Sequence, residues 1–439
     1  MAVTPPDMAE VVVVGGGLAG LVAARTLADR ENDVVLFERR ETVGGRVRSR
    51  EVDGFTLDRG FQVLFTAYPA VRRELDLYAL GLRRFTPGAT LARPGQRSTL
   101  SDPLRDPRAA TATLFNHEVT LGDKWRILPL RRALSGKAPA EVFSGEDTTI
   151  EAYLRGRGFS RQFVENFAAP FYGGITLNRS LSTSKAVFEY TFGMLSAGGT
   201  AVPAGGMGAI PAQLASRARE AGVEIATGTP VEAVTPEGNV GPGDESVVVE
   251  TPGETVTADA AVVATDPATA WELTGVDAIP TEARSCVTQH LALPDVQELQ
   301  SGTRLLLNAA DGRPNQVAPM SAVAPEYAPE GRQLLSATFL GEQEADDATL
   351  LEEVRGALAS WFPENQFSGL ELVGTDRIGF AQFDQPPGFY RELPAVDAPA
   401  GPVVLAGDYT RWSSIQGAME SGREAARTVC EAAERRRRL

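Results

Sequence analysis

Three glycines and a carboxylate near the start of the chain have a spacing that could bind a dinucleotide. They lie in the stretch VVVVGGGLAGLVAARTLADRENDVVLFERR, where the glycines follow the pattern G-x-G-x-x-G and the carboxylate comes 18 residues after the last of them. Such glycines allow a tight turn, close approach of backbone N–H groups to a pyrophosphate and close helix–strand packing, while the carboxylate accepts hydrogen bonds from a ribose. The candidate contacts are Gly15, Gly17, Leu18, Ala19, Gly20 and Glu38.

The same stretch contains the elements that must position these residues. Residues 11–14 are four valines, which predict a buried strand, and from Leu18 the apolar residues recur with helical spacing. A second apolar run, 34–37, predicts a strand that ends at Glu38. The N-terminus of the helix would then face the phosphate charge. The alternative is a glycine-rich turn in some other α/β domain.

A second glycine pair indicates which dinucleotide is bound. Gly44, Gly45 and Arg46 follow shortly after Glu38 and Arg39. FAD needs such a pair, because its second half runs back across the same domain. The glycines would let the backbone approach the pyrophosphate, and the guanidinium of Arg46 would offset phosphate charge. We include Arg39 among the candidate cofactor contacts; for Arg46 the alternative is a solvated surface arginine.

The stretch GGGLAG…FERR…VGGRVRS resembles the FAD-binding start of the flavin amine oxidase superfamily, which includes monoamine and polyamine oxidases, protoporphyrinogen oxidases and carotenoid desaturases. The resemblance implies an α/β fold, in which a mixed α+β substrate domain is inserted into a Rossmann-like FAD-binding domain. We expect the FAD domain at residues 1–90, 200–275 and 400–439, and the substrate domain at 91–199 and 276–399. Residues 236–245, rich in Gly, Pro and Glu, are expected to form a hairpin loop.

Two later segments agree with this resemblance. In residues 222–267, the superfamily's equivalent of Val231 holds the adenine ring through its backbone. In residues 403–429, Gly407 and Asp408 stand where the family binds the ribityl chain. A helix expected from Ser414 would direct the N–H of Ile415 at the flavin, where its dipole favours negative charge.

The amino-acid composition restricts the kinds of partner and the cellular compartment that we expect. The net charge is −15, and only three of the 42 basic residues are lysine, so we expect no nucleic-acid partner. An acidic, arginine-rich surface is typical of a salt-loving host, with genomic composition as the alternative. Two cysteines, Cys286 and Cys430, indicate a reducing compartment, and neither lies where monoamine oxidases link their flavin covalently. We therefore expect FAD to be bound non-covalently. We also expect a cytoplasmic protein, because no secretory signal or spanning segment is visible; peripheral contact with the membrane is compatible with this location.

The prediction of the substrate rests on weaker sequence signals. Amine oxidases of the superfamily carry a lysine late in the substrate domain and an aromatic residue at the position of Ser414, whereas this chain has no lysine after Lys185. The stretches GGGLAGLVAARTLAD, GFQVLFTAYPAV and AGDYT, with GAMESGREAA after the last, resemble plant- and cyanobacterial-type phytoene desaturases. Both departures disfavour an amine, and the resemblance implies a lipophilic polyene.

Few other side chains could do chemistry. The two histidines, His117 and His290, have no metal or triad spacing and are interpreted as surface or packing residues, so no metal site and no catalytic residue are assigned. Eight aromatic residues lie within 159–195, where Phe159, Phe163 and Phe167 recur every four residues. Core packing is one interpretation; the wall of a long apolar tunnel, or a surface that dips into a bilayer, is the other.

The sequence therefore predicts an FAD-dependent oxidoreductase that takes hydride to flavin N5 from an apolar, carotenoid-type substrate. Protoporphyrinogen and amines are the alternative substrates. A different class stays open as well: a redox-neutral carotenoid isomerase or a non-catalytic flavin-binding partner. The oligomeric state is left open.

Overall fold

The computed structural model describes residues 8–437, apart from 238–244, 296–298, 300 and 311. The valine run lies in β1 (Met8–Val14), which leads through the glycine turn into α1 (Leu18–Ala28) and then β2 (Val34–Glu38). β1 and β2 pair in parallel. Their continuous apolar stretches are buried, as expected for parallel strands that are covered on both faces of the sheet. The predicted strand–turn–helix–strand unit is confirmed.

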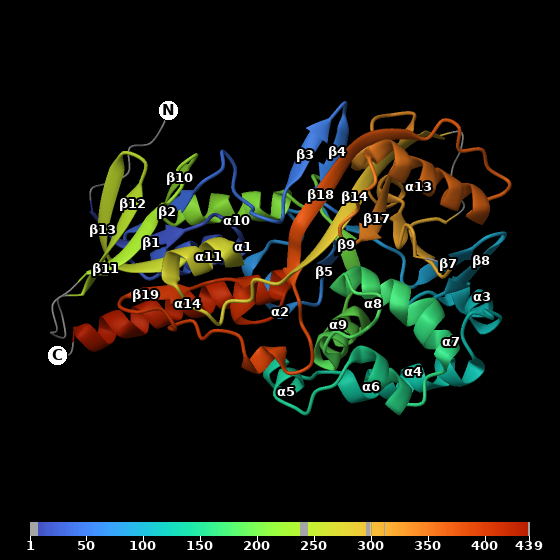
Figure 1. Cartoon of the computed structure of the whole chain (residues 1–439), viewed down its shortest axis with the longest axis horizontal. Coiled ribbons are helices and arrows are strands. Elements are labelled where there is room, and N and C mark those ends of the chain that lie inside the picture. Colours follow the sequence, from blue (N-terminus) through green and yellow to red (C-terminus); the bar gives the residue numbers. More distant parts are fainter. Residues whose placement is uncertain (1–7, 238–244, 296–298, 300, 311, 438–439) are drawn as a thin grey trace.

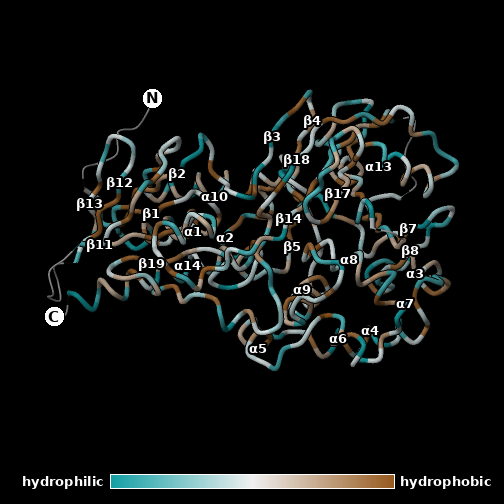
Figure 2. The backbone as a smooth tube through the Cα atoms, viewed as in Figure 1, coloured by the Kyte–Doolittle hydropathy of each residue, from teal (hydrophilic) through white to brown (hydrophobic). Residues whose placement is uncertain are grey.

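Segments far apart in the sequence complete this first sheet. Its order is β10-β2-β1-β13-β12-β11, with β19 beside β13 (Figure 1). The added strands are β10 (Glu224–Thr227), β11 (Ala233–Glu237), β12 (Ser246–Thr251), β13 (Glu254–Val263) and β19 (Val403–Leu405). Its helices besides α1 are α10 (Ala209–Glu220), α11 (Pro267–Thr274) and α14 (Ile415–Arg436). The hydrophobic stretch of β1 is coloured brown in Figure 2.

The crossing of α1 and α14 depends on a small residue. A Cβ added to Gly422 of α14 would lie 2.1 Å from the carbonyl oxygen of Ala19 in α1. The two helices can therefore approach closely only with glycine at this position. This contact fixes the C-terminal helix beside the glycine turn.

A second sheet forms the other half of the molecule, in the order β18-β14-β17-β16-β15-β7-β8. All its pairings are antiparallel except β15 with β7. Its strands are β7 (Ala89–Arg93), β8 (Gln96–Leu100), β14 (Ala283–Pro294), β15 (Leu305–Asn308), β16 (Gln316–Ala318), β17 (Arg332–Leu340) and β18 (Glu371–Phe383). The helix α13 (Asp347–Trp361) buries Leu350, Val354 and Leu358 against it.

Helices between residues 107 and 197 form the helical part of the molecule; many of their apolar residues share a separate core, whereas Val142 and Phe143 belong to the core around the first sheet. They are a 3₁₀ turn (Pro107–Ala109), α3 (Ala110–Leu114), α4 (Leu121–Leu134), α5 (Pro139–Phe143), α6 (Ile150–Gly156), α7 (Arg161–Phe163), α8 (Ala169–Thr176) and α9 (Lys185–Ala197). Figure 1 shows α3, α4 and α7 at the end of the molecule opposite to β11–β13. The mixed α/β fold class is confirmed, and the residue boundaries of the two domains stay predictions.

The remaining described elements are short. They are β3 (Ser49–Val52), β4 (Phe55–Asp58), β5 (Leu64–Phe65), α2 (Pro69–Glu74), β6 (Arg83–Arg84), β9 (Thr200–Val202), α12 (Met320–Val323), and 3₁₀ turns at Pro325–Tyr327, Phe389–Arg391 and Asp408–Thr410. Of the hairpin loop expected at 236–245, Pro236 and Glu237 belong to β11, and 238–244 lie outside the described residues. Among the helices that the structure describes, none has the length and apolarity to cross a bilayer.

Candidate active site

The glycine turn between β1 and α1 is shaped by packing at two of its glycines. Gly15 has φ +108°, which L side chains rarely adopt, and a Cβ there would lie 2.6 Å from the carbonyl oxygen of Ala264. A Cβ on Gly20 would lie 1.9 Å from the carbonyl oxygen of Gly15. Both positions therefore require glycine for the turn and for the close approach of helix to strand.

Gly17 differs, because a Cβ there would meet no atom within 4 Å. It is the N-cap of α1, and no side chain caps this helix end. Gly17, Leu18 and Ala19 line a large cavity. The first N–H groups of α1, which no intrahelical carbonyl can accept, are thus available to an anion in the cavity. This open cradle fits a pyrophosphate.

Glu38 lies at the end of β2 and is buried. Its Oε2 accepts a hydrogen bond from the N–H of Gly16 at 2.8 Å, and its Oε1 accepts one from the N–H of Arg40 at 3.0 Å. Each carboxylate oxygen can accept a further bond. Because Glu38 also lines the cavity, it can accept ribose hydroxyls without losing its backbone partners.

The second glycine pair contacts the first turn. The N–H of Gly44 donates to the carbonyl of Gly16 at 2.8 Å, and a Cβ on Gly45 would lie 3.4 Å from Cα of Gly17. Gly44 and Gly45 both have positive φ. Two glycine segments therefore border one space, as a pyrophosphate held between them would require.

The two arginines expected near the cofactor have carboxylate partners. Arg46 forms an ion pair with Asp408 at 2.5 Å, and Arg39 forms one with Asp266 at 3.2 Å. Although burial opposes the charge of Arg46, the carboxylate of Asp408 raises the pKa of its guanidinium above the usual value. Arg46 and Asp408 thus form one polar unit, although they are 362 positions apart in the sequence. The sequence motifs predict them as two separate contacts.

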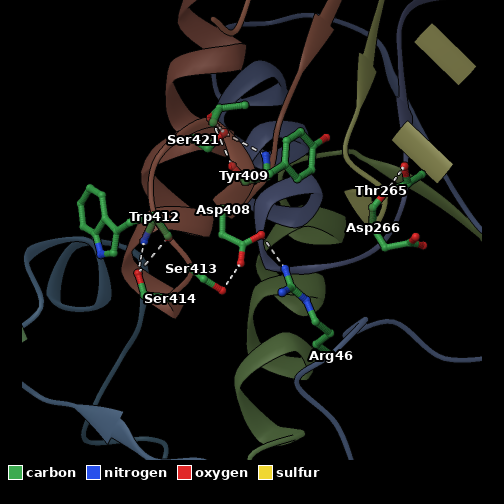
Figure 3. Close-up of polar contacts among 12 residues, drawn as sticks. Arg46, Thr265, Asp266, Asp408, Tyr409, Trp412, Ser413, Ser414 and Ser421 are labelled. Atoms are coloured by element: carbon green, nitrogen blue, oxygen red, sulfur yellow. Dashed lines mark hydrogen bonds and ion pairs between the residues drawn. The ribbon is translucent and has the colours of Figure 1, made fainter. Parts of the chain in front are cut away.

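The segment after β19 continues this polar unit (Figure 3). Asp408 accepts a hydrogen bond from the Oγ of Ser413 at 2.9 Å, and the N–H of Gly407 donates to the Oγ of Ser421 at 2.9 Å. The helix begins one residue after the expected Ser414, which is instead its N-cap and accepts from the N–H of Gly417 at 2.8 Å. The N–H of Ile415 belongs to the first turn, whose donors have no intrahelical acceptor, and Ile415 lines the cavity.

Val231 is the residue for which the resemblance implies an adenine contact. The preceding segment is held against the end of β2, since the N–H of Thr229 donates to the carbonyl of Glu38 at 2.9 Å. Val231 lines the same cavity as Glu38. All the candidate contacts except Gly20 thus line one cavity, as the binding of one extended dinucleotide requires. Gly20 instead allows the close packing of α1 against the turn at Gly15.

The cavity has a volume of about 1310 Å³ and extends from the glycine turn to the helical part of the molecule. This exceeds the roughly 300–1,000 Å³ of ordinary ligand pockets, as a site for a cofactor together with a substrate would. Aromatic side chains line much of it: Phe37, Phe61, Phe65, Tyr68, Phe85, Trp125, Phe163, Phe167, Phe171, Tyr172, Phe188, Phe192, Phe380 and Trp412.

The aromatic run serves both as core and as cavity wall. Phe159, Phe163, Phe167 and Phe171 form a ladder of rings with centroids 4.5, 5.4 and 5.3 Å apart. The four-residue spacing predicts one regular helical face, and this prediction is wrong. Phe159 precedes α7, and residues 164–168 form a π-helical turn. Phe159 lies in the helical core, while the next three rings also line the cavity.

Several residues of the site were not found from the sequence. Trp412 lines the cavity, stacks on Phe143 with centroids 4.7 Å apart, and buries an indole N–H that has no partner among the described residues. Cys286 also lines the cavity, and burial raises the pKa of its thiol to about 11. Asp266, the partner of Arg39, is the N-cap of α11, and the Asp-Pro pair that opens this helix was a usable signal.

The histidines lie outside the cavity lining. His290 is buried, with Nδ1 3.0 Å from the Oγ of Ser336 and Nε2 3.1 Å from Asp376, whereas His117 is exposed. No cluster of three or more metal-binding side chains occurs in the described part of the chain. The interpretation of His290 as a packing residue agrees with this geometry.

The match to a family covers nearly the whole chain. The family described as "Flavin containing amine oxidoreductase" matches residues 18–430. The chain therefore belongs to this family of flavin-containing oxidoreductases.

Three known proteins illustrate the breadth of the likeness. The zeta-carotene-forming phytoene desaturase of Myxococcus xanthus is 30% identical over 293 residues, which are 60% of this chain and 54% of the relative. A putative protoporphyrinogen oxidase from Exiguobacterium sp. 255-15 has a TM-score of 0.69 at 18% identity, covering 98% of this chain and 100% of the other. Cyclohexylamine oxidase from Brevibacterium oxydans IH-35A has a TM-score of 0.68 at 17% identity, with the same coverage. The alignment spans about half of the desaturase, and the two structures share the fold.

Proposed function

We propose that this protein binds FAD non-covalently and uses it to dehydrogenate a lipophilic, carotenoid-type substrate by hydride transfer to flavin N5. The observation that carries the proposal is the single cavity, which joins the glycine cradle to a long aromatic wall. The relative from Myxococcus xanthus, a zeta-carotene-forming phytoene desaturase, supports the same substrate class.

The described residues fit FAD. The uncapped N-terminus of α1 and the open space at Gly17 suit a pyrophosphate, and Glu38 retains acceptor capacity for a ribose. When bound, FAD supplies a two-electron acceptor that the side chains of the chain do not provide. The high pKa of Cys286 keeps the one cavity-lining cysteine protonated near neutral pH, which disfavours a covalent link to the flavin.

The chain itself would orient the substrate and exclude water. Aromatic rings from α7 to α9 form an apolar wall, along which an extended polyene can lie with few polar groups to desolvate. Apart from Arg59 and Glu272, the charged side chains of the lining lie on the cofactor-binding segments or on residues 102–131, beside exposed apolar residues. No catalytic base is assigned.

An amine is the second candidate, favoured by one specific arrangement. Tyr68 stacks on Tyr190 with centroids 5.9 Å apart, and Tyr190 contacts Trp412 edge-on at 5.1 Å. Tyr68 and Trp412 line the same cavity as Ser414 and could offer ring faces to a cationic amine. The absence of any lysine after Lys185 argues against this alternative.

Anaerobic mixing distinguishes these substrates. Oxidised protein would be mixed with phytoene-type polyenes in liposomes, with protoporphyrinogen or with a panel of amines, while flavin absorbance is followed. We expect bleaching by the polyene; rapid bleaching by an amine with none by polyenes would overturn the substrate class. Acceptor consumed per product then separates a dehydrogenase from a redox-neutral isomerase, which consumes none. Protein that binds FAD but changes none of these compounds would indicate a non-catalytic flavin-binding partner.

Acid precipitation tests the mode of cofactor binding. We expect yellow flavin in the supernatant after the protein is precipitated with trichloroacetic acid, because a non-covalent cofactor is released when the fold is lost. Flavin that stays with the washed pellet would contradict the proposal.

A further inference from the structure

Exposed apolar side chains gather on one face of the helical part. Of the eight large hydrophobic residues that are exposed in the described part of the chain, six lie between residues 104 and 128. The most exposed of the six are Trp125 at 72% and Leu104 at 71%. We name the group the α3–α4 face; its members are Leu104, Leu114, Phe115, Leu121, Trp125 and Leu128. Soluble proteins seldom expose such a cluster without a partner for it.

This face is built from segments that are tied together. The ion pair of Arg131 with Asp102 (2.8 Å) holds α4 to the loop before α3. The ammonium of Lys124 donates to the carbonyls of Leu114 and Asn116, both at 2.8 Å, and so joins α4 to the end of α3. The face therefore presents its side chains as a defined surface rather than on separate loops.

The helix α4 is apolar on two opposite sides. Leu130 and Leu134 are buried in the helical core. Leu121, Trp125 and Leu128 recur at i, i+4 and i+7 and are exposed. A surface helix ordinarily has polar residues on its outer side. The outer apolar stripe of α4 has no covering element among the described residues.

The cavity continues onto this face. Every member of the α3–α4 face except Phe115 also lines the cavity, which further in is lined by Phe163 and Phe167. Figure 1 shows α3 and α4 at the end of the molecule away from the first sheet. The route from outside to the aromatic wall thus starts among exposed apolar side chains.

The charge around the face is opposite to that of the whole chain. Residues 101–137 contain seven basic and four acidic residues, although the net charge of the chain is −15. The four carboxylates are engaged internally: Asp102 with Arg131, Asp106 with Arg304, Glu118 with Arg93, and Asp123 with Ser160 and Thr120. Arg108, Arg126 and Arg132 are exposed and form no ion pair with any residue that the structure describes.

We propose that the α3–α4 face is a membrane-docking surface for an anionic bilayer. The stripe of α4 would sit at the level of the headgroups and acyl chains, with Trp125 at the interface and the neighbouring arginines facing lipid phosphates. The cavity mouth would then open to the acyl chains, so that an apolar substrate enters without crossing water. Docking follows from the face alone; the entry route also rests on the proposed function.

A second copy of the chain fits this face less well than a membrane does. Two α3–α4 faces in contact would bring the unpaired guanidinium groups of Arg108, Arg126 and Arg132 on one copy towards those on the other. Like charges in a partly dry contact repel. Anionic headgroups pair with the same groups.

Vesicle co-sedimentation of the purified holoprotein, without substrate, tests the docking. We expect binding to phosphatidylcholine vesicles that contain 30% phosphatidylglycerol and weaker binding to pure phosphatidylcholine. Phe115→Asp should weaken binding about tenfold or more, since a Phe that inserts in the bilayer is replaced by a charge. Arg126→Glu/Arg132→Glu should remove the preference for anionic vesicles.

Matched substitutions elsewhere control for general effects. Tyr78→Asp, at the most exposed aromatic residue, and Arg219→Glu/Arg435→Glu, at exposed arginines of α10 and α14, should bind vesicles like the unchanged protein. Equal FAD content and melting temperature identify the variants that have folded. Absence of vesicle binding, equal loss in the controls, or a dimer that Phe115→Asp dissociates while no vesicle is bound would each overturn the proposal.

Fluorescence gives a second measurement that needs no destabilising change. Brominated lipids should quench the tryptophan emission of bound protein, Trp125→Phe should remove most of the quenching, and Trp271→Phe should leave it. Quenching that survives Trp125→Phe would place the contact elsewhere.

A substrate arm separates the two proposals. Phe115 does not line the cavity, so Phe115→Asp should lose flavin reduction by polyene in vesicles and keep it in detergent micelles. Equal reduction in both media would overturn the entry route. If the unchanged protein is reduced in neither medium, the polyene proposal fails while the vesicle result stands.

Discussion

At the scale of single residues, Glu38 has two tasks that can be separated. Its carboxylate accepts the N–H groups of Gly16 and Arg40, which shapes the turn, and it lines the cavity, which suits a ribose. Loss of a hydrogen bond to a charged group costs about 1.5–3 kcal/mol. Loss of the charge should therefore lower cofactor affinity, while a side chain that keeps a carbonyl acceptor should preserve the turn.

Glu38→Gln should weaken FAD binding about tenfold to a hundredfold, as measured by fluorescence titration of the apoprotein. Gln keeps one carbonyl acceptor, so the fold should be retained. Glu41→Gln, an exposed neighbour outside the cavity lining, is the matched control and should bind FAD normally. Unchanged affinity in Glu38→Gln would mean that another group binds the ribose.

The glycines of one motif differ in what a methyl group would do. A Cβ on Gly17 meets no atom within 4 Å, whereas a Cβ on Gly20 would lie 1.9 Å from a backbone oxygen. Gly17→Ala should therefore fold with a nearly unchanged melting temperature in the apo form but bind FAD at least about tenfold more weakly. Gly20→Ala should lower the melting temperature or prevent folding. Normal FAD affinity in folded Gly17→Ala would show that the pyrophosphate does not occupy the cradle.

Residue types and local spacing predict the glycines and Glu38 as cofactor contacts, and the family resemblance adds Asp408; these roles stay predictions. The glycines, Glu38 and Asp408 carry their signal in short motifs, because each motif forms one turn. The pairs Arg46–Asp408 and Arg39–Asp266 could not be read in this way, since each joins residues more than 200 positions apart. Trp412 was missed because its burial beside Phe143 is decided by tertiary packing.

At the scale of elements, the predictable helices and strands are those with a strong local pattern. The valine run predicts β1, whereas the family resemblance predicts the start of α14 at Ser414, one residue before the helix begins. The π-helical turn at 164–168 has no such signal, because the four-residue recurrence of Phe suits a regular helix equally well. The exposed stripe of α4 was also hidden, since apolar residues on a helix ordinarily indicate burial.

The start of α4 depends on a capping box. Thr120 accepts the N–H of Asp123, while the carboxylate of Asp123 accepts the N–H of Thr120 and a bond from the Oγ of Ser160 at 2.6 Å. Asp123→Asn should lower the free energy of unfolding by about 1–2 kcal/mol at pH 7, the usual cost of a lost cap. Urea unfolding at saturating FAD measures this difference.

The same residue predicts a pH dependence. Burial works against ionisation of Asp123, but hydrogen bonds from Ser160 and Thr120 outweigh it and lower its pKa. A carboxyl with a lowered pKa in the folded state stabilises the fold above its unfolded pKa of about 3.9, and this contribution is lost as pH falls through the folded value. The difference between Asp123→Asn and the unchanged protein should therefore be full at pH 7 and shrink below pH 4. A difference that stays constant with pH would contradict the charged cap.

At the scale of the whole molecule, the two halves contribute different things to one cavity. The first sheet supplies backbone donors and carboxylates, which are suited to a charged cofactor, and the helical part supplies aromatic rings, which are suited to an apolar ligand. The cavity also links the cofactor end to the exposed α3–α4 face. An enzyme for a water-insoluble compound needs all three features in one continuous space.

The net charge of −15 leads to a prediction about salt. Excess negative charge destabilises a compact chain through self-repulsion, and salt screens charges that are more than a Debye length apart, about 10 Å at 0.1 M. Salt also weakens the many Arg–carboxylate pairs, such as Arg377–Asp347 and Arg313–Glu353, but exposed pairs are each worth only about 0–1 kcal/mol.

Relief of self-repulsion should therefore dominate, and the melting temperature at saturating FAD should rise by roughly 2–8 °C between 0.05 and 1 M KCl. Sucrose at the same osmolality is the control, because it changes water activity without screening charge. A melting temperature that falls with KCl would mean that attractive pairs outweigh the repulsion. In that case the acidic composition would reflect genome composition rather than adaptation of the surface to salt.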